Sequence, residues 1–272
     1  MTIPISVCII TLNEEDNIRR CLSSLEFADE IIIVDSGSTD NTLLIAKEFP
    51  RIFIHYRKFD NYINQKNYCK SLAKNEWILA LDADEEISIE LQNEIKNITK
   101  DSMKEYSGFF IPRLSFYMGK WIRHGGWYPN YQMRFFRKDK GEFSGQLVHE
   151  TVSIEGKTSH FKNPLSHYSY RNISDHLKFI DRYSELCAIE KFNKGKKSGL
   201  TLAIIEAIWK FISMYFVRFG FLDGKVGLII SILGSYYNFL KYIKLYEMNR
   251  KKEKSNPLQH IQQDNGNSPL ST

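Results

Sequence analysis

The sequence WILALDADE, residues 77–85, joins an apolar run to an acidic turn. The run from Trp77 to Leu81 is short and has no polar interruption, which is typical of a strand buried on both faces of a parallel sheet. Asp82 and Asp84 follow at positions i and i+2, and in an extended backbone such residues point to the same side. Two carboxylates at the end of a buried strand favour a hard divalent cation such as Mg²⁺ or Mn²⁺.

Other meanings of this acidic motif fit less well. An EF-hand calcium loop starting at Asp82 would need glycine at its sixth position, where Ile87 stands, and helices rather than a strand on its flanks. A pair of solvated surface carboxylates is the simplest alternative. This alternative is less favoured because the ends of neighbouring strands carry polar side chains as well.

Three further apolar runs precede this strand at the spacing of one strand plus one crossover helix. They cover residues 5–10, 31–34 and 52–54, and the segments between them carry apolar residues at three- and four-residue steps. This alternation predicts a doubly wound, mostly parallel α/β sheet of the Rossmann type. Ligands of such sheets bind at the carboxyl ends of the strands.

The first two strands also end in polar side chains. Thr11-Leu12-Asn13-Glu14 closes the first strand, and the second ends at Asp35, followed by Ser36-Gly37-Ser38-Thr39-Asp40. Asp35 is suited to accept a hydrogen bond from a ribose hydroxyl or a uracil NH, while Gly37 allows a tight turn. Asp40 is interpreted as a helix cap rather than as a ligand.

The pattern changes after residue 100. Shorter, aromatic strands in residues 101–171 predict an α+β half that completes the site. Residues 172–255 are predicted to form a helical extension. Residues 256–272 are polar with two prolines, and we expect a flexible tail there.

Length and composition are those of an ordinary globular protein. The chain has 272 residues, 43% hydrophobic and 25% charged, and its four cysteines form no CxxC pair. This excludes a disordered or collagen-like chain and argues against a disulfide framework or a zinc site. The net charge of +5 is too small to indicate a nucleic-acid partner, and the N-terminus lacks signal-peptide features. We therefore expect a cytoplasmic protein with reduced thiols.

Taken together, the strand ends resemble those of the family 2 glycosyltransferases, which have the GT-A fold. The segments that carry this resemblance are 11–14, 34–40 and 81–85. Three more segments resemble the lipopolysaccharide-core glucosyltransferases that add β-1,4-glucose to the first heptose: Asn64–Asn67, Arg134–Arg137 and Val148–Glu150. The resemblance implies a GT-A domain over residues 1–171, with a nucleotide-sugar half (1–100) and an acceptor half (101–171).

The resemblance also implies an activity. A metal-dependent, inverting transferase would move a hexose, glucose in the first instance, from UDP-glucose to a lipopolysaccharide or lipooligosaccharide core or a related surface glycan. Transfer of another sugar to another glycan is an open alternative. The nucleoside diphosphate would contact Thr11, Asn13, Glu14, Asp35, Lys66 and Asp82, and Mg²⁺ or Mn²⁺ would be held by Asp82 and Asp84. Of Arg134 and Arg137, we expect one to bind a phosphate and the other to lie at the surface.

Inversion in a single displacement requires a general base that takes the proton of the acceptor hydroxyl. Many relatives supply it from a Glu-Asp pair, which this sequence lacks after Asp84. We expect Glu150 to be the base, because it lies between two strand-like segments; an exposed strand carboxylate is the alternative. His149 is the expected third metal ligand, and His160 and His167 are less favoured choices.

Two apolar stretches mark the helical extension, 200–219 and 226–240. The first includes Glu206, Lys210 and Arg218, and the second is shorter than the about 20 residues that cross a bilayer. A transmembrane helix is therefore disfavoured. A core-packed helical pair and an amphipathic hairpin at the membrane interface both stay open. We expect peripheral contact with the cytoplasmic face of the inner membrane, where a lipid-linked acceptor would be found.

Two other functions compete with the transferase. A nucleotide-binding oxidoreductase on a Rossmann sheet would need a GxGxxG turn after the first strand, and residues 11–16 contain no glycine. A catalytically inactive sheet scaffold is the second rival. The carboxylates of Asp35, Asp82 and Asp84 argue against it.

Overall fold

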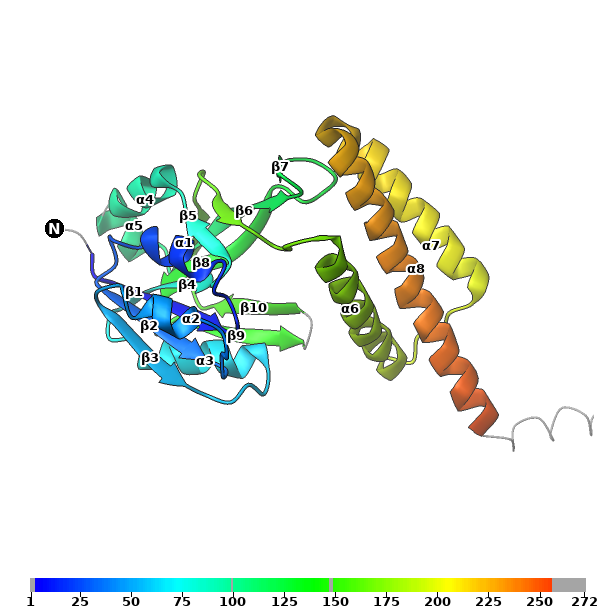
Figure 1. Cartoon of the computed structure of the whole chain (residues 1–272), viewed down its shortest axis with the longest axis horizontal. Coiled ribbons are helices and arrows are strands. Elements are labelled where there is room, and N and C mark those ends of the chain that lie inside the picture. The colour runs from blue at the N-terminus through cyan, green and yellow to red at the C-terminus, as the bar shows by residue number, and fades with distance from the viewer. Residues whose placement is uncertain (1–2, 99, 147–148, 256–272) are drawn as a thin grey trace, which may run out of the picture. The chain divides into compact units, whose positions relative to one another are not determined.

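A computed structural model describes residues 3–98, 100–146 and 149–255, and the chain divides into two units, Met1–Asn172 and Ile173–Thr272. The first unit is an α/β structure on a large sheet, and the second is helical (Figure 1). The predicted flexible tail, residues 256–272, lies outside the described residues.

Four parallel strands form the first half of the sheet, in the order β3-β2-β1-β4. Register places Thr11 opposite Asp35, and Ile10 opposite Asp82. The polar ends of β1, β2 and β4 therefore lie side by side at one edge. The elements of this half are β1 (Ile5–Thr11), α1 (Ile18–Ser23), β2 (Glu30–Asp35), α2 (Thr42–Ala46), β3 (Ile52–Tyr56), α3 (Tyr62–Leu72) and β4 (Trp77–Asp82).

The second half of the sheet is mixed. β8 pairs antiparallel with both β4 and β6, and the sheet continues through β12 to β5, while β7 and β11 pair with β6. β9 and β10 form a separate hairpin. The change from a parallel α/β half to an α+β half confirms the predicted fold class. The elements are β5 (Glu85–Ile87), α4 (Ile89–Lys96), α5 (Lys100–Glu105), β6 (Gly108–Tyr117), β7 (Lys120–Ile122), β8 (Asn130–Arg137), β9 (Gly141–Gln146), β10 (His149–Ile154), β11 (Thr158–His160) and β12 (Leu165–His167).

The core lies on both faces of the sheet, because successive side chains of a strand point to opposite sides. Val7 and Ile9 of β1 pack on one face with residues of α1 and α4. Cys8 of the same strand packs on the other face with Ile32 and with Cys69 of α3. All four cysteines are buried and free, as expected for reduced thiols.

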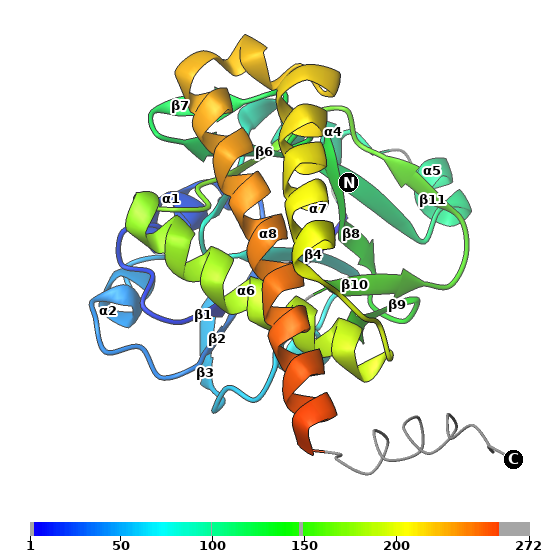
Figure 2. The same cartoon turned by 90° about the vertical axis from the view of Figure 1, so that its right-hand side faces the viewer.

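The second unit consists of helices. α6 (Ile173–Asn193) is followed by α7 (Leu200–Ile212), the π-helical turn η1 (Ser213–Val217), the 3₁₀ turn η2 (Gly220–Asp223) and α8 (Gly224–Ser255). α7 and α8 run antiparallel as a hairpin, and α6 packs along the C-terminal half of α8 (Figure 2). Two contacts fix α6 there: Cys187 Sγ lies 3.1 Å from Tyr237 Oη, and Lys244 Nζ lies 2.7 Å from Asp181 Oδ1.

Two local expectations do not hold. The second apolar stretch is not too short to span a membrane, because it belongs to the 33-residue helical segment Gly220–Lys252. By length and composition, this segment and the 18-residue segment 200–217 could each cross a bilayer. The prediction counted uncharged residues and missed the continuity of the helices. Asp82 and Asp84 are also not on one extended segment, because the chain turns at Ala83 and Asp84 before β5 begins.

Candidate active site

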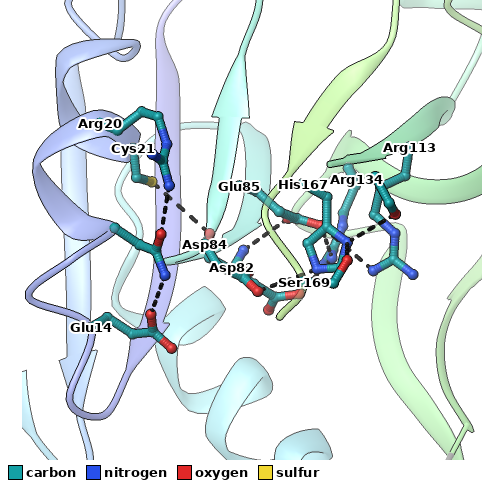
Figure 3. Close-up of polar contacts among 12 residues, drawn as sticks. Glu14, Arg20, Cys21, Asp82, Asp84, Glu85, Arg113, Arg134, His167 and Ser169 are labelled. Atoms are coloured by element: carbon teal, nitrogen blue, oxygen red, sulfur yellow. Dashed lines mark hydrogen bonds and ion pairs between the residues drawn. The ribbon is translucent and has the colours of Figure 1, made fainter. Parts of the chain in front are cut away.

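The acidic turn after β4 contains a buried ion network. Asp82 Oδ1 lies 2.9 Å from Lys66 Nζ of α3, and Asp82 Oδ2 accepts a hydrogen bond of 2.6 Å from Arg134 Nη2 of β8. The same nitrogen donates to Glu85 Oε1 at 2.7 Å (Figure 3). Glu85 Oε2 in turn accepts from the backbone N–H of Asp82 at 2.9 Å. The first aspartate of the motif is thus held by side chains from three elements.

These contacts fix the charge of the network. Burial alone would raise the pKa of the Asp82 carboxyl, but the charges of Arg134 and Lys66 and their hydrogen bonds outweigh burial and hold that pKa well below its usual range. Burial would lower the pKa of Arg134, and the carboxylates of Asp82 and Glu85 raise it instead. Asp82 and Arg134 are therefore both charged at neutral pH.

Asp84 has a different partner. Its Oδ2 lies 3.2 Å from Nε2 of His167, and the two side chains are 22% and 14% exposed. Antiparallel pairing of β12 with β5 brings the histidine there, since His167 is opposite Glu85 in the register. Nδ1 of the same ring lies 2.8 Å from Ser169 Oγ, which orients the imidazole (Figure 3).

The loops after β1 and β2 are tied together by predicted site residues. The carboxylate of Asp35 accepts from the N–H groups of Gly37 and Ser38, at 2.8 and 2.9 Å, and from Ser38 Oγ at 2.5 Å. Asn13 adopts a left-handed backbone conformation with φ of 57°, which asparagine tolerates, and its Oδ1 accepts from the N–H of Thr39 at 2.8 Å. Asp35 and Asn13 therefore shape the turn that borders the site.

Thr11, Glu14 and Asp40 complete this edge. Thr11 Oγ1 is buried and has no hydrogen-bond partner among the described residues. Glu14 accepts a hydrogen bond of 2.8 Å from Asn17; burial raises the pKa of its carboxyl, and the nearby charge of Asp84 raises it further. Asp40 accepts from the backbone N–H of Thr42, the first residue of α2, at 3.0 Å, but the N-cap position itself is occupied by Asn41 and not by Asp40 as expected.

Only the backbone is described for the predicted base, Glu150, and for the predicted third metal ligand, His149. The backbones of His149 and Glu150 lie at the start of β10, where Glu150 pairs with Gly145 of β9. Their side chains lie outside the described residues, so both roles stay predictions. Among the side chains that are described, no group of three or more His, Cys, Asp or Glu residues is arranged to hold a metal ion.

The hairpin that carries Glu150 is fastened to α3. Asn67 Nδ2 donates to the backbone oxygen of Phe143 at 2.8 Å, and its Oδ1 accepts from the N–H of the same residue at 2.9 Å. Lys70 Nζ also donates to the backbone oxygen of Gly141 at 2.6 Å. The hairpin is therefore fastened to the same helix that supplies Lys66.

Sequence patterns missed three contributors to this site. One of Arg134 and Arg137 was expected to bind a phosphate and the other to lie at the surface. Arg134 is instead buried and paired with two carboxylates. The side chain of Arg137 is 31% exposed and pairs with Glu76 at 2.7 Å. Glu85 was quoted in the motif without a role, and His167 was ranked below His149. The available signal was an arginine inside the apolar run of β8, since a buried charge needs a buried partner.

Comparison with known proteins identifies the family. The family model described as "Glycosyl transferase family 2" matches residues 6–147, which include the ends of β1, β2 and β4. The chain belongs to glycosyl transferase family 2. This membership confirms the predicted enzyme class and the GT-A fold, and it excludes the oxidoreductase reading.

Relatives of this family 2 glycosyltransferase extend beyond the matched domain. An uncharacterized glycosyltransferase of Rickettsia typhi is 32% identical over 258 residues, 91% of this chain and 88% of that protein. The lipopolysaccharide core biosynthesis glycosyltransferase LpsC of Rhizobium meliloti is 28% identical over 261 residues, 93% of this chain and 96% of that protein. Alignments of this length include helical segments of the second unit. Among solved structures, S. aureus TarS 1–349 in complex with UDP-GlcNAc is 16% identical, with a TM-score of 0.48 and 92% of each chain covered.

Proposed function

We propose that this family 2 enzyme is a metal-dependent, inverting transferase that moves a hexose, glucose in the first instance, from a UDP-sugar to a lipopolysaccharide core or related surface glycan. The observation that carries the proposal is the grouping of acidic residues at adjacent strand ends, with Asp35 and Asp82 flanking the end of β1 and Asp84 in the next turn. Ligands of doubly wound sheets bind at this edge. Similarity to LpsC supports the acceptor class.

The donor would be held by the loops after β1 and β2 and by α3. The unpartnered hydroxyl of Thr11 and the carboxylate of Asp35 are suited to the nucleoside, since both are buried polar groups at the carboxyl ends of neighbouring strands. Asn13 and Glu14 border the same edge. Lys66, fixed by its ion pair with Asp82, supplies positive charge for the diphosphate.

Asp84 and His167 fit a divalent cation. Mg²⁺ and Mn²⁺ take carboxylate and imidazole ligands and fill their remaining positions with water and phosphate oxygens. Ser169 fixes the ring through Nδ1, which leaves Nε2 to face Asp84. A bound cation would neutralise the charge that develops on the diphosphate leaving group. In this arrangement Asp82 orients the turn, and His167 takes the place predicted for His149.

Glu150 is the proposed general base. Its strand belongs to the hairpin that Asn67 and Lys70 fasten to α3. The carboxylate would accept the proton of the acceptor hydroxyl while that oxygen bonds to the anomeric carbon and the bond to the UDP leaving group breaks.

Calorimetric titration of UDP, GDP and NAD into the full chain, with Mn²⁺ and then with EDTA, tests the proposal. We expect UDP to bind at least tenfold more tightly with Mn²⁺ than with EDTA and more tightly than GDP. UDP binding of equal strength in both buffers would refute metal dependence. Absence of nucleotide binding in either buffer would favour an inactive scaffold.

A further inference from the structure

The hairpin of α7, η1 and α8 exposes most of its large apolar side chains. Only 17% of the residue 200–217 segment and 28% of an apolar 18-residue window within Gly220–Lys252 is buried, whereas the core helix of a soluble protein is mostly buried. Side chains with exposed fractions between 51% and 60% include Ile205, Ile208, Trp209, Phe216, Leu222 and Ile232.

The exposed surface of α7 has no polar face. At 3.6 residues per turn, its exposed positions from Leu200 to Ile212 cover about 200° of the circumference, and none of them is charged. The charged residues of this segment, Glu206 and Lys210, are half-buried and lie on the side toward α8. A helix lying flat at a membrane interface needs a polar face turned to water, and α7 does not offer one.

The contact between the two helices includes polar groups. Ser235 Oγ of α8 donates to the backbone oxygen of Ala207 at 2.7 Å, and Asn238 Nδ2 donates to the backbone oxygen of Glu206 at 3.2 Å. Polar groups inside and apolar groups outside are the reverse of a helical pair in water. Helices that associate within lipid have this arrangement.

Two glycines of α8 make close contacts with the turns η1 and η2, which follow α7. A Cβ atom at Gly234 would lie 2.5 Å from Met214 Sδ, and one at Gly227 would overlap the backbone oxygen of Gly220. Small residues at a helix contact are a second feature of helices packed in a bilayer.

Positive charge gathers at the open end of the hairpin. Residues 194–197, before α7, include three lysines, and residues 250–252, near the end of α8, are Arg-Lys-Lys. The two segments are neighbours, since Asn249 Nδ2 donates to the backbone oxygen of Lys196 at 3.4 Å. Basic residues flanking an apolar hairpin match anionic lipid headgroups and the positive-inside rule.

We propose that the α7–α8 hairpin inserts end-on into a lipid bilayer, with its basic open end at anionic headgroups and its apolar outer faces against the acyl chains. The 18 residues of the first segment are about 27 Å long at 1.5 Å per residue, close to the about 30 Å of the hydrocarbon core. The insertion is independent of the transferase activity proposed above.

Depth-dependent quenching tests the orientation. Ile208→Cys and Lys197→Cys are labelled with the fluorophore NBD in the full chain, whose native cysteines are buried, and mixed with vesicles of phosphatidylethanolamine and phosphatidylglycerol (3:1). We expect the label at Ile208 to be quenched more by 12-doxyl than by 5-doxyl lipid, and the label at Lys197 to stay in water. If the label at position 208 is quenched more by 5-doxyl than by 12-doxyl lipid, the hairpin lies flat on the membrane and the proposal is overturned.

A charge substitution tests the apolar face. Ile208→Glu should lower the partition coefficient into the same vesicles at least tenfold, while Ile89→Glu, at a 72% exposed residue of α4, should leave it unchanged. Circular dichroism melting of both variants checks the fold. Vesicle binding of Ile208→Glu equal to that of the unmodified chain overturns the proposal. A dimer in sedimentation without vesicle binding also overturns it, because a second copy would then cover the face.

Discussion

Arg134 donates a hydrogen bond of 2.6 Å to Asp82 from a side chain that is only 6% exposed. The same nitrogen also donates to Glu85, whose side chain is fully buried. One guanidinium therefore pairs with two neighbouring carboxylates at the centre of the site, where Lys66 adds a second positive charge beside Asp82. Removing one partner from a buried ion network costs several kcal/mol.

Arg134→Met should lower the free energy of unfolding by about 3–5 kcal/mol, because it leaves Asp82 and Glu85 buried with one partner fewer. Arg137→Met is the matched control. Its side chain is 31% exposed and pairs with the exposed Glu76, so its loss should cost less than about 1 kcal/mol. Urea denaturation followed by circular dichroism measures both. Equal losses in the two variants would contradict the central role of Arg134.

The folded state should lose stability at low pH because Asp82 becomes protonated. Its pKa in the folded protein lies below the value of about 3.9 in an unfolded chain, so the ionised carboxylate stabilises the fold above pH 4. That contribution declines as the pH falls from about 4 toward 2, where the unfolded chain binds the proton first. Asp82→Asn should therefore show a smaller loss of melting temperature over this range than the unmodified chain.

Asp16→Asn serves as the control for the acid titration, since the Asp16 side chain is 62% exposed. Its melting temperature should follow that of the unmodified chain across the same pH range. A profile for Asp82→Asn that also follows the unmodified chain would exclude Asp82 as a source of the acid sensitivity.

The strand-end residues could be predicted because the information is local. Apolar runs ending at Thr11, Asp35 and Asp82 specify buried strands, and parallel order brings their ends to one edge. His167 could not be placed in this way. It meets Asp84 only because the three-residue strand β12 pairs antiparallel with β5. The paired residues are 78 to 82 positions apart in the sequence, and no periodic pattern indicates such a contact.

The helical unit shows a second limit of local patterns. Counting charges along residues 200–219 suggested that Glu206, Lys210 and Arg218 would interrupt a membrane segment. In the structure Glu206 and Lys210 lie toward α8, and the exposed Arg218 follows the apolar segment 200–217, so the outer surface of α7 carries no charge. The character of a helix depends on which face its charges occupy, and that face is set by the partner helix.

His167→Ala should weaken binding of UDP in Mn²⁺ at least tenfold and leave the affinity in EDTA unchanged, because the imidazole facing Asp84 is proposed to contact the cation. His160→Ala is the control: this exposed histidine of β11 stacks on Phe110, with ring centroids 5.0 Å apart. Calorimetry in both buffers gives the comparison. A similar loss in the two variants, or a loss that persists in EDTA, would remove His167 from the cation site.

Asp84→Asn should abolish the metal-supported part of UDP binding, whereas Glu150→Gln should keep the donor affinity within about twofold and lower the transfer rate by about 10²–10⁴-fold, the usual contribution of a general base. Glu142→Gln, on the neighbouring strand β9, should change neither quantity. Calorimetry with UDP and a single-turnover transfer assay separate binding from chemistry. A loss of donor affinity in Glu150→Gln as large as in Asp84→Asn would assign Glu150 to donor binding and leave the base to another residue, because a group that acts only on the acceptor proton does not hold the nucleotide.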